Sequence, residues 1–105
     1  MQYDIPYNAE TRLMAYNGKI IIDVEDDDPI ILRFIYDDSG GLLEGYEAYC
    51  VFDSAIRRKV IDDMVEVPID VLIGDRIRIQ LMFCKENKRF YSLNILTLKL
   101  NKVIS

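Results

Sequence analysis

At 105 residues the chain has room for one domain, and its composition, half hydrophobic and 30% charged, excludes a disordered protein. Its 18 acidic and 13 basic residues give a formal net charge of −5. We expect no nucleic-acid partner on this ground, because a phosphate-binding face needs a surplus of Lys and Arg.

The N-terminal segment is the least regular part of the sequence, and we interpret residues 1–18 as a possible N-terminal arm. Tyr3, Ile5 and Tyr7 alternate as in a short strand, which Pro6 would confine to a sheet edge. The start is polar and unlike a signal peptide, and no apolar stretch reaches the ~20 residues of a membrane helix. We therefore expect synthesis in the cytoplasm and no membrane partner.

Period-two alternation of apolar residues, which is typical of strands, recurs through the rest of the chain. The clearest case is residues 75–84, with Ile77, Ile79, Leu81 and Phe83 on one side. An α-helix would scatter these four, since its successive side chains turn by about 100°. Weaker versions of the pattern cover residues 19–24, 30–36, 46–52, 64–67 and 89–100. The last changes phase near residues 95–97, which predicts a bulge or a strand that moves to another sheet.

Polar turns separate these segments. Residues 25–29 and 37–41 are rich in Asp and end in Pro or Gly. Asp62-Asp63 is a predicted tight turn between a strand that ends near residues 60–61 and the strand over residues 64–67. Residues 86–88 are a predicted short hairpin, in which Asn87 tolerates the left-handed conformation.

One segment breaks the alternation. Pro68 and Gly74 bracket residues 69–73 as the two ends of a single helical turn. Its apolar side, Ile69 with Leu72 and Ile73, would plug an open end of the fold. Together these elements predict an all-β protein, a small β-sandwich or partly open barrel of six to eight mostly antiparallel strands, with residues 1–105 as one domain.

An acidic cluster precedes the second strand, and its candidate metal ligands are Asp23, Asp26, Asp27 and Asp28. Ca²⁺ prefers six to eight oxygen ligands, but the DxDxDG spacing of an EF-hand is missing, so we favour a solvated acidic turn. If residues 30–36 pair antiparallel with residues 20–24, a second acidic group, Asp37 with Asp38, lies about 20–25 Å away.

Cofactor chemistry and catalysis have little support in the sequence. Cys50 and Cys84 form no CxxC pair and the chain has no histidine, so a Cys/His zinc site cannot be built. We favour two free thiols, expect no cofactor, and note that the commonest general base near neutral pH is missing. No GxSxG, P-loop or GxGxxG motif is present. We therefore expect no catalytic residues and no enzymatic activity.

Tyrosine is enriched, and its ring offers a large contact area with a polar tip, as protein interfaces require. The candidate partner-binding residues are Tyr3, Tyr7, Tyr16, Tyr49 and Tyr91. A half-buried position within the sheet is the competing interpretation for the last two. Two basic runs, residues 57–59 and residues 85–89, are interpreted as solvated strand ends rather than as an anion site.

Several stretches together form a further pattern. They are Ile20-Ile21-Ile22-Asp23-Val24, Ile31-Leu32-Arg33-Phe34, Asp37-Asp38-Ser39-Gly40, Gly45-Tyr46-Glu47-Ala48-Tyr49 and residues 67–76. Over about residues 19–84 the chain thereby resembles the N-terminal β-sandwich modules of upper-baseplate and tail-fibre proteins from phages of Gram-positive bacteria. A second glycine after Ser39-Gly40 departs from that pattern.

The resemblance implies an oligomeric component of a phage virion. We expect a non-enzymatic module that self-associates or docks on a larger tail, baseplate or head assembly, through sheet edges and an apolar face that carries tyrosines. Two alternatives stay open. One is a small acidic inhibitor that blocks a basic partner site, and the other is a calcium- or carbohydrate-binding sandwich.

Overall fold

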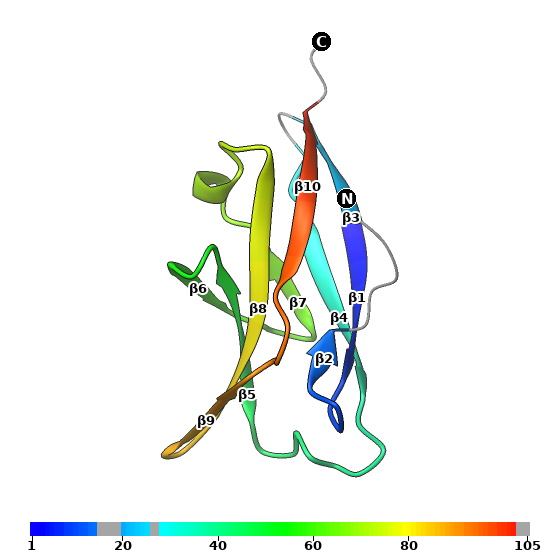
Figure 1. Cartoon of the computed structure of the whole chain (residues 1–105), viewed down its shortest axis with the longest axis vertical. Coiled ribbons are helices and arrows are strands. Elements are labelled where there is room, and N and C mark those ends of the chain that lie inside the picture. Colours follow the sequence, from blue (N-terminus) through cyan, green and yellow to red (C-terminus); the bar gives the residue numbers. More distant parts are fainter. Residues whose placement is uncertain (15–19, 26–27, 103–105) are drawn as a thin grey trace.

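The computed structural model describes residues 1–14, 20–25 and 28–102. In this part of the chain lie ten strands and one 3-10 turn (Figure 1). The strands are β1 (Gln2–Asn8), β2 (Leu13–Met14), β3 (Ile20–Val24), β4 (Ile31–Asp37), β5 (Glu47–Phe52), β6 (Ile56–Lys59), β7 (Met64–Glu66), β8 (Arg76–Lys85), β9 (Lys88–Tyr91) and β10 (Leu96–Lys102). The 3-10 turn, η1, covers Ile69–Val71. The predicted all-β fold is confirmed.

Two mixed sheets pack against each other as a sandwich around one core (Figure 1). One has the strand order β2-β1-β4-β7, and the other the order β3-β10-β8-β5-β6, with β9 also paired to β8. β1 with β4 and β3 with β10 are parallel, whereas the other pairs of described strands are antiparallel. The described residues form ten strands rather than six to eight, because residues 2–14 supply β1 and β2 and the last predicted strand is divided into β9 and β10.

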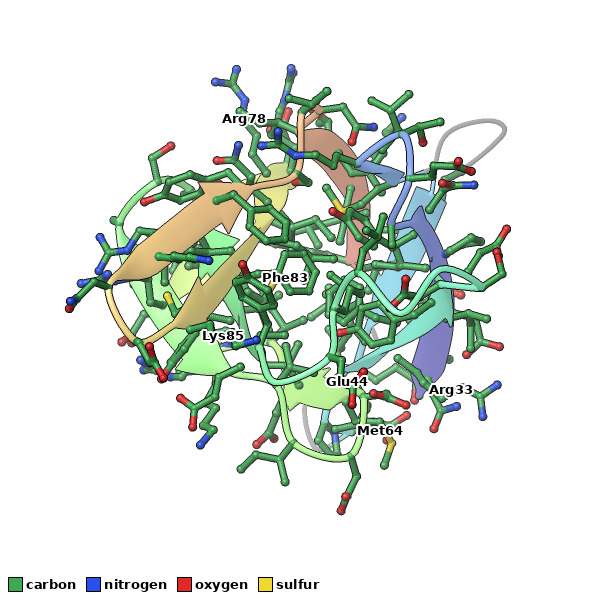
Figure 2. All side chains as sticks on the ribbon, turned by 90° about the horizontal axis from the view of Figure 1, so that it is seen from below. Arg33, Glu44, Met64, Arg78, Phe83 and Lys85 are labelled. Carbon is green, nitrogen blue, oxygen red and sulfur yellow. The ribbon has the colours of Figure 1, made fainter. Side chains whose placement is uncertain are left out.

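The core confirms the strongest sequence pattern. Ile77, Ile79 and Leu81 of β8 are fully buried and Phe83 is 2% exposed. Figure 2 shows Phe83 between the two sheets and Arg78, from the same strand, pointing away from them. The alternation of β8 therefore supplies the centre of the sandwich and, on its other side, an outward-pointing row in which Arg76 and Arg78 are exposed.

Within the segment interpreted as a possible arm, residues 2–8 form a strand of the sandwich. β1 pairs with β4 over its whole length, from Gln2 opposite Ile31 to Asn8 opposite Asp37. β2 pairs only with Tyr7 and Asn8, so the outer edge of β1 at Pro6 has no partner strand in the described structure. This agrees with the prediction that Pro6, which has no N–H to donate, lies at a sheet edge.

β3 and β4 lie in different sheets, which corrects the assumed antiparallel pair. β3 pairs with β10, with Ile22 opposite Leu100, whereas β4 pairs with β1. The polar connection ending in Pro29 crosses from one sheet to the other instead of closing a hairpin. The separation inferred between the two acidic groups therefore no longer holds.

The predicted helical turn exists, but its buried side was wrongly predicted. Val71 is 7% exposed, whereas Ile69 is 78% and Ile73 85% exposed. Only two backbone hydrogen bonds close the turn, from the N–H of Val71 to Pro68 and of Leu72 to Ile69. With so little helix, α-helical spacing does not decide which side faces the core.

The predicted irregularity in the C-terminal segment lies slightly earlier, between β9 and β10. Both strands pair with the same edge of β8, so the chain stays in one sheet. The side-chain amide of Asn94, in this break, donates to the carbonyl of Met14, and its oxygen accepts from the N–H of Met14, both at 2.8 Å. The N–H of Leu93 donates to the carbonyl of Arg12 at 2.7 Å. These bonds tie the break to β2 and close one side of the sandwich.

Candidate interaction surfaces

The structure separates the five candidate tyrosines. Tyr7 is 1% exposed in the core, so its assignment as a contact residue was wrong. The hydroxyl of half-buried Tyr3 accepts a hydrogen bond from the N–H of Asp23 at 3.0 Å and thereby joins β1 to β3. Tyr16 lies outside the described residues.

The other two tyrosines share one row across the outer side of the larger sheet. Tyr49 on β5 and Tyr91 on β9 lie on either side of Met82 on β8. Met82 points away from the core and is still only 2% exposed, while Tyr91 is 39% exposed. The two tyrosines therefore flank and shield an outward-facing methionine, and they form the apolar centre of this side.

Basic residues from four strands gather around that row. Alternation places every second residue of each strand on the outer side of the sheet. These outward positions include Arg57, Lys59, Arg76, Arg78, Arg89 and Lys99, all exposed. Glu47 and Asp23 are the carboxylates at outward strand positions there, and Glu47 binds Lys59 at 3.4 Å. We call this side the basic face.

The interpretation of the basic runs as strand ends missed this arrangement. Arg57 and Lys59 lie on the basic face, whereas Arg58, between them, points to the opposite side of β6. Arg89 joins the basic face from the second run, opposite Cys84 of β8. The signal in the sequence was basic residues at every second position of a strand, as in Arg76 and Arg78, rather than adjacent basic residues.

The smaller sheet has the opposite charge on its outer side, here called the acidic face. Its outward strand positions carry Asp4, Asp37 and Glu66, with Arg33 as the cation. The Nε and Nη2 atoms of Arg33 donate to Asp4, at 3.0 and 2.8 Å, and these bonds hold the pKa of that carboxyl below its usual value.

A groove of about 1070 Å³ lies where β6, β7, η1 and the connection before β4 approach each other. Three of the most exposed large hydrophobic residues in the described structure line it, namely Ile73, Ile69 and Ile61, which is 64% exposed. Val65 and Val67 form its buried floor. We call this the isoleucine groove.

A smaller pocket of about 510 Å³ lies near the connection between β4 and β5, lined in part by Tyr36, Tyr46 and Phe83. Carboxylates border it, among them Glu44 and Asp63. The ammonium group of Lys85 lies 5.5 Å from the centre of the Tyr46 ring, in a cation–π contact. The chain itself thus supplies a cation to this aromatic end of the sandwich.

The acidic segment has ordinary structural partners where it is described. Asp23 accepts a hydrogen bond from the side-chain amide of Asn101 at 2.9 Å, and Asp28 pairs with the N-terminal ammonium group at 3.1 Å. Asp26 and Asp27 lie outside the described residues. Within the described ranges no group of three metal-ligating side chains occurs.

The two cysteines are free, with Cys50 in the core and Cys84 half-buried on the basic face. Burial raises the pKa of the Cys50 thiol. No helix among the described residues is long and apolar enough to span a membrane.

The comparisons with known proteins bear on the fold. No protein-family model and no curated protein matches the chain. Among solved structures, the chain is similar to the N-terminal domain of phage TP901-1 ORF48, with a TM-score of 0.55 over 96% of this chain and 97% of that one. The two share a fold. Their sequences are 11% identical, so the resemblance to phage β-sandwich modules is confirmed for the fold alone.

Proposed function

We propose that the chain is a non-enzymatic structural module of a phage particle that docks on a larger tail or baseplate assembly. The observation that carries this proposal is the fold shared with the N-terminal domain of phage TP901-1 ORF48 over nearly the full length of both chains. Since fold does not determine function, the surface of this chain has to support the role.

The isoleucine groove gives that support. Ile61, Ile69 and Ile73 are each more than 60% exposed and line one concavity. Fully burying one such side chain contributes roughly 1.5–3 kcal/mol, so three together favour contact with a partner strongly. Covering this groove is therefore the main driving force of the proposed docking.

The core chemistry also fits a role without catalysis. Cys50, one of two thiols in the chain, is enclosed by the core and its raised pKa keeps it protonated. The alternative role as an acidic inhibitor has weaker support, because six cations share the basic face and a mimic of an anionic surface would carry one sign of charge.

Quantitative mass spectrometry of purified particles, from the phage whose genome encodes the chain, tests the proposal. We expect the chain in a fixed ratio to the tail proteins, and still bound after washing with 1 M salt, since apolar contacts resist screening. Its absence from particles that are otherwise complete would refute the role. A non-structural protein of the same phage serves as the control for carry-over.

A further inference from the structure

The two broad sides of this sandwich have opposite charge. The basic face has six cations against two carboxylates at its outward strand positions. Two of the six are already paired, Lys59 with Glu47 at 3.4 Å and Arg76 with Asp75 at 3.3 Å, which leaves four cations without such a pair. The acidic face has three carboxylates against one cation, and that cation is already bound to Asp4. A chain with a net charge of −5 therefore has its cations concentrated on one of its two sheets.

Each charged face also carries apolar side chains. On the acidic face Ile35 is 43% and Met64 37% exposed. On the basic face Tyr91 is 39% exposed, beside half-buried Val51 and Tyr49. The two faces are thus complementary in charge, and both offer apolar contact area near their centres.

We propose that the basic face of one copy binds the acidic face of a second copy, head to tail. This names a partner for the assembly role proposed above and rests on that role. Because the two surfaces are different, the contact leaves a free acidic face at one end and a free basic face at the other. Further copies then add, and the product is a ring or a filament rather than a closed two-fold dimer.

The size of the faces sets the strength of the contact. The seven-residue strands of the acidic face extend about 23 Å, and four strands spaced about 4.8 Å apart span roughly 15–20 Å. This area is well below the ~800 Å² per partner of a standard interface. The association of isolated copies is therefore weak, and it depends on concentration and on salt.

The choice of a second copy over a nucleic acid follows from the distribution of charge. Carboxylates outnumber cations on the rest of the molecule, and a long polyanion would be repelled by them once it extended past the sheet. A second copy, in contrast, places the carboxylates of its acidic face against the basic face and does not extend along the rest of the molecule as a polyanion would. At 0.1 M salt the Debye length is about 10 Å, so distant repulsion between copies is screened while the facing charges still attract.

Light scattering and sedimentation equilibrium of the purified chain test the proposal. In 0.1 M salt we expect a mass that rises with concentration beyond twice the 12.3 kDa of one chain, and in 1 M salt a return toward the monomer. The basic-face variant Arg57→Glu with Arg78→Glu and the acidic-face variant Asp37→Lys with Glu66→Lys should each associate at least about tenfold more weakly.

The mixture of the two variants is the decisive sample. Each variant keeps one intact face, so an equimolar mixture associates again through the two intact faces, whereas each variant alone does not. The matched control is Lys85→Glu with Lys88→Glu. It changes the net charge by the same amount as the basic-face variant, and its residues lie off the outward row of the basic face. This control should associate within about twofold of the unchanged chain.

Three results would overturn the proposal. They are a strict monomer at 1 mM in 0.1 M salt, equal association of the basic-face variant and the unchanged chain, and a mixture that stays monomeric while circular dichroism shows folded variants. Titration with a labelled 12-nucleotide oligo-dT completes the test. If the chain stays monomeric and binds this oligonucleotide, the basic face is a nucleic-acid site and not a contact between copies. The particle composition is measured separately, so the docking role survives any of these results.

Discussion

Tyr7 and Tyr36 carry tyrosine hydroxyls that are shielded from water and have no hydrogen-bond partner among the described residues. Their rings meet edge to face, with centres 6.1 Å apart. Burial raises the pKa of both phenols. The folded protein therefore holds these protons more tightly than the unfolded chain, whose tyrosines ionise near pH 10.

The contribution of these two tyrosines to the free energy of unfolding should therefore be constant below pH 10. Above pH 10 the free energy of unfolding should fall, because the unfolded chain releases protons that the folded chain retains. Urea denaturation between pH 8 and 11.5 measures this. The variant Tyr7→Phe with Tyr36→Phe should weaken the decline and leave stability at pH 7 within about 0.5 kcal/mol, because no hydrogen bond is lost. A loss above about 1 kcal/mol at pH 7 would mean that the hydroxyls have partners.

At the scale of elements, the turn between β6 and β7 shows how tight turns are encoded here. Asp62 and Asp63 have φ of 53° and 64°, and Ile61 exchanges both backbone hydrogen bonds with Met64, at 2.9 and 3.0 Å. Two positive φ values define the hairpin turn for which Asn-Gly is the preferred pair. Aspartate tolerates this conformation but does not favour it as glycine does.

Replacing this pair by Asn and Gly, with Asp62→Asn and Asp63→Gly, should raise the free energy of unfolding by about 0.5–1 kcal/mol. Relief of the left-handed conformation contributes roughly 1–2 kcal/mol per residue at most, and the greater freedom of glycine in the unfolded chain offsets part of it. The β-branched variant Asp63→Val should lower it by about 1–3 kcal/mol, because its backbone must then occupy a strained region. Urea denaturation measures both. Equal stability of the two variants would show that the turn adopts another conformation.

The elements also show what the sequence could predict. Strong alternation located β8, because a strand at the centre of the core needs every second residue apolar. The hairpin after Lys85 was predicted too, but its positive φ lies at Glu86 and not at Asn87. The parallel partners of β1 and β3 are distant in sequence, and local patterns carry no information on them.

At the scale of the whole molecule, the candidate surfaces arise from topology. Arg57, Arg76 and Lys99 lie far apart in the sequence, and only the strand order brings them to one face. The isoleucine groove follows from η1, where one short turn directs Ile69 and Ile73 outward. Sequence reasoning expected an apolar contact surface at the tyrosines and did not find the isoleucine groove, because aromatic enrichment is visible without a fold and the exposure of isoleucines is not.

Photo-crosslinking in assembled particles shows whether a protein of the particle covers the isoleucine groove. A benzoyl-phenylalanine probe replaces Ile73 in one sample and Leu42 in the control. Leu42 is 53% exposed in the connection before β5 and does not line the groove. Irradiation should convert the chain with the probe at position 73 into a covalent product heavier than 12.3 kDa, and leave the control chain unchanged. An uncrosslinked chain at position 73, or equal crosslinking at position 42, would contradict the account.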